Sequence, residues 1–187
     1  MNRIKNQYIV LCLIALLALG LWLYNAELYG DVFRLMLIPL GLWWLSQKQY
    51  RLMAYFVCVV AVILGIAFVC KLTFTYIASH YGDLQSVQDI IEIAKRPING
   101  EFKGFPSGHT TAAFTAAALM WYFMGKQWGI LAFILALFVG YSRIISLWHT
   151  PMQVCAGAFL GFVGSLALIM LLNKIDKTCK KDYNPRP

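Results

Sequence analysis

The sequence predicts an all-α, polytopic membrane protein that forms a single domain over residues 1–187. Hydrophobic residues make up 60% of the chain and charged residues only 13%, whereas soluble domains have about 45–50% and about 25%. The apolar residues also gather in runs of the length that crosses a bilayer, with short polar gaps between most of them. A soluble domain of this size could not bury so much apolar side chain, so that class is excluded.

Six apolar runs predict six membrane-spanning helices. They cover residues 8–24, 32–46, 52–70, 107–124, 128–147 and 151–172. The first run follows Arg3 and Lys5, and we interpret it as an uncleaved anchor because it is long and lacks a small-residue cleavage site. The second run is the shortest and contains Arg34 and Pro39.

The third and fourth runs are separated by the only long loop that we predict, residues 71–106. Four apolar residues recur there at helical spacing among charged residues: Leu84, Val87, Ile91 and Ala94. This pattern predicts a short amphipathic helix that lies along the membrane interface. The helix could gate substrate access, or it could simply cap the bundle.

The net charge of +8 predicts a topology rather than a nucleic-acid partner. The basic residues lie in the gaps between apolar runs and form no single patch, so we expect no nucleic-acid binding. If the N-terminus is cytoplasmic, ten of the 16 Lys and Arg residues lie inside, five lie outside and Arg34 lies within a span. This distribution follows the positive-inside rule and places both termini, including the basic tail 173–187, in the cytoplasm.

The five cysteines predict neither a metal site nor a disulfide framework. They show no Cys-x-x-Cys pairing, and four of them lie in apolar runs, where a thiol behaves as a small hydrophobic group. We therefore expect no metal ligand and no cofactor.

Chemically distinctive residues begin at the start of the fourth run, with Pro106-Ser107-Gly108-His109. Proline and serine are common at a helix N-terminus, and glycine lets a ligand approach the backbone closely. The free N–H groups of such a terminus favour phosphate. Alternatively, Ser107 is only a helix cap.

Arg143 and His149 follow at the end of the fifth run. Because the fourth and fifth runs form a hairpin across the membrane, His109 and Arg143 should lie on the same face. Arg96, in the long loop, is expected on that face too. Arginines bind phosphate, and histidines can act as nucleophile or proton donor. The alternative is that Arg143 and His149 are interface residues without a chemical role.

At these residues the chain resembles the type 2 phosphatidic acid phosphatase superfamily. The signature of that family is Lys-x6-Arg-Pro, then Pro-Ser-Gly-His, then Ser-Arg-x5-His-x3-Asp. The matching residues are Arg96-Pro97, Pro106 to His109, and Ser142-Arg143 through His149. The resemblance implies a six-helix fold and metal-independent phosphoryl transfer, with His149 as nucleophile and His109 as proton donor. It also implies that Arg96, Ser107, Gly108 and Arg143 hold the phosphoryl oxygens.

Two positions depart from the family signature. Asp89 stands where the signature has lysine, and Lys95 or Lys103 could replace that missing cation. Gln153 stands where the signature has aspartate, and its amide could still orient the His149 imidazole through a hydrogen bond.

An active site at the outer membrane boundary favours an amphiphilic phospholipid or lipid diphosphate as substrate. Gly100 and Phe102 after Arg96-Pro97, and Thr150 after His149, resemble bacterial lipid A 1-phosphatases. The resemblance therefore implies a lipid A 1-phosphatase of the bacterial inner membrane with a periplasmic active site. Undecaprenyl diphosphate phosphatase, phosphatidylglycerophosphate phosphatase, a lipid phosphotransferase and a non-catalytic membrane protein remain alternatives. The sequence does not predict the oligomeric state.

Overall fold

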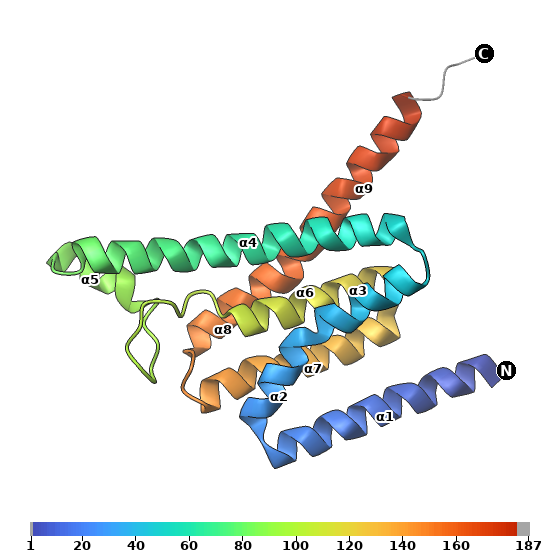
Figure 1. Ribbon diagram of the computed structural model, residues 1–187, viewed down its shortest axis with the longest axis horizontal. Coiled ribbons are helices and arrows are strands. Elements are labelled where there is room, and N and C mark those ends of the chain that lie inside the picture. The colour runs from blue at the N-terminus through green and yellow to red at the C-terminus, as the bar shows by residue number, and fades with distance from the viewer. Residues whose placement is uncertain (1, 183–187) are drawn as a thin grey trace.

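The protein is all-helical over the residues that the computed structural model describes, which are the backbone of 2–182 and the side chains of 9–176 (Figure 1). In chain order the helices are α1 (Asn2–Tyr24), α2 (Ala26–Phe33), the 3₁₀ turn η1 (Arg34–Met36), α3 (Leu37–Ser46), α4 (Tyr50–Tyr81), α5 (Gln85–Glu92), α6 (Gly108–Phe123), α7 (Lys126–Ile145), α8 (Pro151–Phe159), the π turn η2 (Leu160–Gly164) and α9 (Ser165–Asp182).

Four helical segments are long and apolar enough to cross a membrane. They are Ala26–Ser46, Tyr50–Tyr81, Lys126–Ile145 and Pro151–Asp176. The first and fourth predicted spans lie in shorter helical stretches, Ile9–Tyr24 of α1 and the 16 residues of α6. The six-span arrangement therefore stays a prediction.

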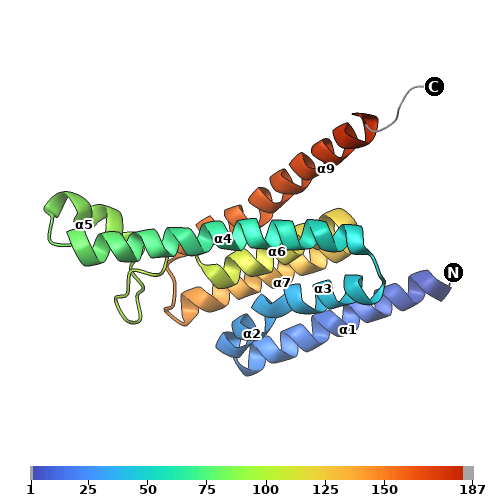
Figure 2. The same ribbon diagram turned by 45° about the horizontal axis from the view of Figure 1, so that its top comes forward.

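Helix α6 lies at the centre of the bundle. It packs against α7, α4, α8 and η2, and both views show it between α4 and α7 (Figures 1 and 2). Its buried residues are mainly small: Thr110, Thr111, Ala113, Phe114, Thr115, Ala116, Ala117, Ala118 and Leu119. Small residues let neighbouring backbones approach closely. The buried threonines of α6 are satisfied within the helix, since Thr111 and Thr115 donate to the carbonyls of Ser107 and Thr111, four residues earlier.

The prediction that the long loop begins at residue 71 is wrong, because α4 continues to Tyr81. The polar residues in this stretch satisfy their own hydrogen bonds without ending the helix. Thr73 and Thr75 donate to the carbonyls of Val69 and Lys71, four residues earlier, and Lys71 Nζ donates to the carbonyl of Lys103 at 3.0 Å. Helix α4 therefore extends past the length of a single span.

Helix α5 occupies part of the segment in which the amphipathic helix was predicted. Ile91 and Ala94 are buried, as expected for an apolar face, but Leu84 precedes the helix and is 52% exposed. The apolar face of the segment is therefore shorter than the sequence spacing suggested.

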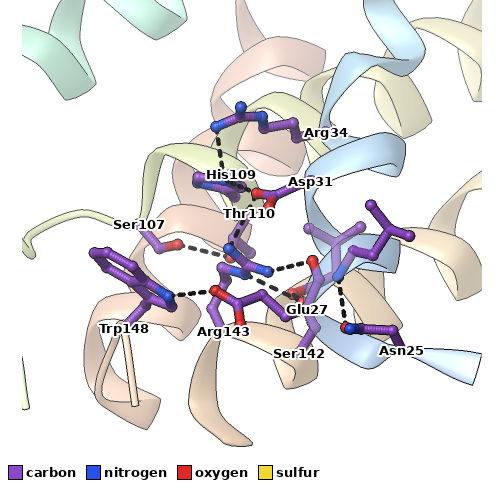
Figure 3. Close-up of polar contacts among 12 residues, drawn as sticks. Asn25, Glu27, Asp31, Arg34, Ser107, His109, Thr110, Ser142, Arg143 and Trp148 are labelled. Atoms are coloured by element: carbon purple, nitrogen blue, oxygen red, sulfur yellow. Dashed lines mark hydrogen bonds and ion pairs between the residues drawn. The ribbon is translucent and has the colours of Figure 1, made fainter. Parts of the chain in front are cut away.

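The second predicted span starts earlier than expected, because α2 begins at Ala26, with Asn25 as its N-cap. The 3₁₀ turn η1 joins α2 to α3, and Pro39 lies in the first turn of α3, where proline is tolerated. The extra N-terminal turns bring Glu27 and Asp31 to the end of the bundle where α6 begins and α7 ends (Figure 3).

Candidate active site

The segments that carry the candidate reactive side chains converge at one end of the bundle (Figure 1). The N-terminus of α6 supplies Ser107 to His109, the end of α7 supplies Arg143, and the α7–α8 connection supplies His149. The loop before α6 reaches this end too, since Ile98 N donates to the carbonyl of Leu147 at 2.9 Å. The structure thus brings together segments that lie far apart in the sequence.

His149 is held by Gln153, one turn into α8. The Nδ1 atom of His149 lies 3.0 Å from Gln153 Oε1, and both side chains are buried. The Gln153 Nε2 group donates to the carbonyls of Ile93 and Lys95, each at 2.9 Å. Only the NH₂ end of the amide can face two carbonyls, so its oxygen must face His149.

This orientation determines the tautomer of neutral His149. An amide oxygen accepts hydrogen bonds and cannot donate them, so Nδ1 must carry the proton. The Nε2 atom is then left with a free lone pair. Thr150 helps to fix the amide, because its backbone N donates to Gln153 Oε1 at 3.2 Å within the capping box of α8. The arrangement presents an imidazole nitrogen that is ready to act as a nucleophile.

The environment of His149 also keeps the ring uncharged. The pKa of His149 is lowered to about 4, first by burial and then by the positive charges of Lys71 and Arg96, while the hydrogen bond to Gln153 opposes the shift. A neutral imidazole is the nucleophilic form. His149 therefore remains in that form throughout the physiological pH range.

Arg96 has a donor available for a ligand. Its Nη1 donates to Glu101 Oε2 at 3.3 Å, and its guanidinium stacks over the ring of Trp148, 5.5 Å from the centroid. Its Nε atom is buried and has no hydrogen-bond partner among the described residues. A buried unpaired N–H is costly, so it indicates a position where an anionic oxygen could be bound.

Lys71, which the sequence analysis placed only in the loop, is a cation of this site. A Cβ atom added to Gly108 would lie 3.7 Å from both Cε and Nζ of Lys71, so the lysine lies directly over the N-terminus of α6. No carboxylate lies within 4.0 Å of Nζ in the part of the chain that the structure describes. Lys71 has apolar residues on both sides in the sequence. That pattern could have indicated that the helix continues past Lys71 and that the lysine has a specific role.

The two lysines that were expected to replace the family lysine lie differently. Lys95 Nζ pairs with Glu92 at 3.0 Å, and Lys103 Nζ lies 4.0 Å from Glu101. Both residues contribute to the site through backbone carbonyls, which accept from Gln153 and Lys71 respectively. The side chains of both lysines are about half exposed.

Ser107 and Gly108 form the N-terminus of α6, as the sequence predicted. Ser107 is fully buried and is the N-cap residue, yet its side chain makes no capping hydrogen bond. Its hydroxyl instead accepts from Thr110 Oγ1 at 3.0 Å, and its backbone N donates to the carbonyl of Gln153 at 3.0 Å. The second bond ties the start of α6 to the residue that orients His149.

Arg143 is almost fully buried and every nitrogen of its guanidinium is engaged (Figure 3). Nη1 donates to Asp31 Oδ1 at 3.2 Å, Nη2 to the carbonyl of Glu27 at 2.7 Å, and Nε to Ser142 Oγ at 3.2 Å. Gly30 makes this possible, because a Cβ atom at that position would lie 2.6 Å from Nη2. Two of the three partners thus come from α2.

His109 has two competing partners on one nitrogen. Its Nε2 lies 2.9 Å from Asp31 Oδ1 and 2.7 Å from Arg34 Nη1. Nε2 must carry a proton to bond the carboxylate, and must lack one to accept from the guanidinium. Asp31 and Arg34 therefore favour opposite protonation states of His109.

The sequence analysis missed the three residues of α2 and η1 in this cluster. Glu27, Asp31 and Arg34 recur at i, i+4 and i+7 in an otherwise apolar segment, which is the spacing of one helix face. Glu27 also accepts from Trp148 Nε1 at 2.8 Å. This polar stripe was the available signal, and a span boundary drawn at residue 32 concealed it.

An apolar cavity of about 870 Å³ lies within the helical bundle. It is lined by Val10, Ile14, Phe33, Met36, Pro39, Leu40, Trp43, Met120, Met124, Trp128, Leu131, Ala132 and Leu135, from α1, the α2–η1–α3 segment, α6 and α7. Phe33 and Met36 flank Arg34 in the sequence, whereas Met124 and Trp128 lie at the α6–α7 turn, so the cavity extends along the bundle away from the candidate site. Every lining residue is apolar, which suits a hydrocarbon chain.

Residues 70–177 match the PAP2 superfamily. Because the match covers more than half of the chain, the chain belongs to this superfamily. The matched region contains Lys71, Arg96, His109, Arg143 and His149, whereas α1, α2 and α3 lie outside it.

Three curated relatives are similar to the chain. The lipid A 4'-phosphatase of Helicobacter pylori (strain J99 / ATCC 700824) is 29% identical over 139 residues, which cover 74% of this chain and 67% of the relative. The bacitracin transport permease protein BcrC of Bacillus licheniformis is 33% identical, over 52% of this chain and 46% of the relative. The probable lipid phosphate phosphatase 4 of Arabidopsis thaliana is 33% identical, over 40% and 29%. No solved structure gives a significant match.

Proposed function

We propose that this protein is a metal-independent lipid phosphate phosphatase that works through a phosphohistidine. The observation that carries the proposal is the fixed tautomer of His149, whose Nδ1 is bonded to the locked amide of Gln153. A buried, neutral imidazole with a free Nε2 beside several cations is suited to attack phosphorus.

In the first step, the Nε2 lone pair of His149 forms a bond to phosphorus while the bond from phosphorus to the lipid oxygen breaks. His109 gives its proton to that leaving oxygen. Arg96, Lys71, Arg143 and the backbone N–H of Gly108 stabilise the charge that develops on the phosphoryl oxygens. The imidazolium that forms at His149 is stabilised by the Gln153 amide oxygen.

In the second step, water attacks the phosphohistidine and releases inorganic phosphate. Neutral His109 takes a proton from the water, which restores both histidines to their starting states. The alternative acceptor is a second lipid alcohol, which would make the protein a phosphotransferase. Both outcomes use the same covalent intermediate.

The substrate we propose is an amphiphile whose hydrocarbon chain enters the apolar cavity between α1, α3, α6 and α7. Among amphiphiles, lipid A has the most support. The sequence resemblance favours the 1-phosphate, whereas the Helicobacter pylori relative is named a 4'-phosphatase. Undecaprenyl diphosphate and phosphatidylglycerophosphate are the other candidates. We propose action at the outer face of the bacterial inner membrane.

The test is a phosphate-release assay of purified full-length protein in the presence of EDTA. The panel contains lipid A, undecaprenyl diphosphate, phosphatidylglycerophosphate and phosphatidic acid, and mass spectrometry of the lipid A product assigns the 1- or 4'-position. We expect release from at least one lipid and its loss in His149→Ala. His80→Ala, which changes the histidine outside the cluster, is the matched control and should retain activity.

Failure to hydrolyse any member of the panel would contradict the proposal, as would an unchanged rate in His149→Ala. Transfer of labelled phosphate to another lipid without release of free phosphate would favour the phosphotransferase. Acid-labile label on the protein should appear in wild type and be missing in His149→Ala, because a phosphorylated imidazole is acid-labile.

The role of the cavity is tested separately. Ala132→Phe would put a ring into the cavity, whereas Ile134→Phe adds the same group to an exposed position of the same helix. We expect Ala132→Phe to lower kcat/KM for a long-chain lipid phosphate by about tenfold, the cost of losing one or two buried methylenes of contact. Neither variant should affect a short-chain, water-soluble phosphate ester.

A further inference from the structure

One carboxylate oxygen lies between two groups that are expected to contact phosphate. Asp31 Oδ1 is 3.2 Å from Arg143 Nη1 and 2.9 Å from His109 Nε2 (Figure 3). A carboxylate and a phosphate offer a guanidinium the same kind of anionic oxygen acceptor. In the geometry of the structure, Asp31 thus makes the contacts that a phosphoryl oxygen would make.

The burial of Arg143 explains why an anion is needed there. Its side chain is only 3% exposed, and a buried guanidinium without a counter-ion is strongly destabilising. Asp31 is the one carboxylate within 4.0 Å of Arg143 among the residues with described side chains. Asp31 therefore supplies the nearest counter-charge to the Arg143 guanidinium.

Asp31 is also free to leave. Its side chain is 43% exposed, so the carboxylate can turn outward into water when a phosphate takes over the contact with Arg143. Two anionic oxygens cannot share the position between Arg143 and His109, because like charges at hydrogen-bond distance repel strongly. Binding of phosphate and docking of Asp31 are thus mutually exclusive.

We propose that Asp31 is a built-in competitor of the substrate phosphate: it occupies the position between Arg143 and His109 in the free protein and is displaced when phosphate binds. The inference rests on the proposed function for its consequence in turnover. Displacement delivers His109 to the leaving oxygen only when a phosphate is present, and return of Asp31 assists release of the phosphate product. Asp31 lies in α2, outside the region that matches the superfamily.

Arg34 remains beside His109 when phosphate displaces Asp31. When Asp31 turns outward, His109 loses its carboxylate partner but keeps the nearby guanidinium, whose Nη1 lies 2.7 Å from Nε2. That positive charge favours transfer of the His109 proton to the leaving oxygen, because it destabilises the protonated ring. The helix face of Asp31 and Arg34 thus supplies one group for the free state and one for the reacting state.

The test measures binding of inorganic phosphate to full-length protein by calorimetry, without turnover. We expect Asp31→Asn to lower the Kd about threefold to tenfold, because an apparent Kd scales with the fraction of molecules in which the position is open. Asp83→Asn is the matched control: it makes the same substitution at an exposed position after α4, outside the candidate site. We expect its Kd to change less than twofold.

Weaker or unchanged phosphate binding in Asp31→Asn would overturn the inference and make Asp31 a positioning residue for Arg143. An equal gain in Asp83→Asn would also overturn it, since the effect would then be general electrostatics. Asp31→Ser provides a second neutral variant if the Asn variant does not fold. Because phosphate binding is measured without turnover, a wild type that hydrolyses no lipid would contradict the proposed function and leave this result interpretable.

Discussion

The amide of Gln153 both accepts and donates hydrogen bonds, whereas an ionised aspartate could only accept them. It accepts from His149 and Thr150 and donates to two backbone carbonyls, so all of its hydrogen-bonding capacity is used. The two donated bonds require an NH₂ group, which a carboxylate lacks. Glutamine in place of the aspartate of the family signature thus suits this site, because the carbonyls of Ile93 and Lys95 need a donor. The neutral amide orients His149 without adding a charge.

Gln153→Glu should raise the pKa of His149, because a carboxylate beside Nδ1 favours the charged imidazolium. In wild type the pKa of about 4 keeps His149 neutral above that pH, so protonation of this residue costs activity only below it. We expect the acid limb of the kcat/KM profile to move to higher pH in the variant. Gln88→Glu, on the exposed face of α5, should leave the limb in place. An unmoved limb in Gln153→Glu would mean that another group controls it.

Lys71→Met should lower kcat/KM by about 10- to 100-fold, the value of one lost hydrogen bond to a charged group. The reason is its position over Gly108, with no carboxylate partner in the described structure. Lys71→Arg keeps the charge and should recover part of the loss. Lys126→Gln is the control for net charge, because Lys126 begins α7 and lies at the end of that helix away from the candidate site. A loss in Lys95→Gln larger than in Lys71→Met would assign the role to Lys95 instead.

At the scale of single residues, the sequence predicted the signature side chains but not their partners. His109, Arg143 and His149 belong to sequence motifs that can be recognised before the fold is known. Asp31 and Lys71 carry none, because their roles depend on which helices pack together. Contacts between residues more than a hundred positions apart, such as Asp31 with Arg143, are set by tertiary packing alone.

Among the helices, close contact between α6 and α8 sets the shape of the site. Gly157 of α8 faces the first turn of α6, and an added Cβ atom would lie 2.7 Å from the Ser107 carbonyl oxygen and 3.1 Å from Thr111 Oγ1. Helix α8 also carries Gln153. The separation of the two helices therefore fixes how far His149 lies from the N-terminus of α6.

Gly157→Ala should lower both the melting temperature and kcat/KM, because the methyl group forces α8 away from Ser107. Gly65→Ala is the matched control in α4, since its Cβ atom would meet nothing within 4 Å. Alanine is a better helix former than glycine by about 1 kcal/mol, so Gly65→Ala should be neutral or stabilising. Thermal unfolding in detergent checks both variants. If Gly157→Ala and Gly65→Ala had the same melting temperature and kcat/KM, the contact between α6 and α8 would be able to accommodate the added methyl group.

The sequence predicted the helical elements more reliably than their ends. Apolar runs identify helices, but the end of a run marks where lipid contact stops, not where the helix stops. Helix α4 therefore continues to Tyr81 and α2 begins at Ala26, each beyond the predicted span. Both extensions reach the candidate site, which explains why their residues were missed.

Over the whole molecule, polar and charged side chains form two layers, one at each end of the bundle. The candidate site, α5 and the α7–α8 connection share one end, and the start of α1 and the α3–α4 turn lie at the other (Figures 1 and 2). Arg51, near that turn, pairs with Asp176 of α9, and Tyr55 Oη donates to Asn173 Oδ1 at 2.7 Å. This second polar layer is where the positive-inside rule places the cytoplasmic face.

This arrangement predicts which loops a membrane-impermeant maleimide can reach in intact cells. In a variant without the five native cysteines, Asn99→Cys in the loop before α6 should be labelled from outside. Gln47→Cys in the α3–α4 turn should be labelled only after the membrane is permeabilised. Both positions are exposed in the structure, so a difference reports sidedness and not burial. The reverse pattern would place the candidate site in the cytoplasm, and with it the ten basic residues on the outside, against the charge rule.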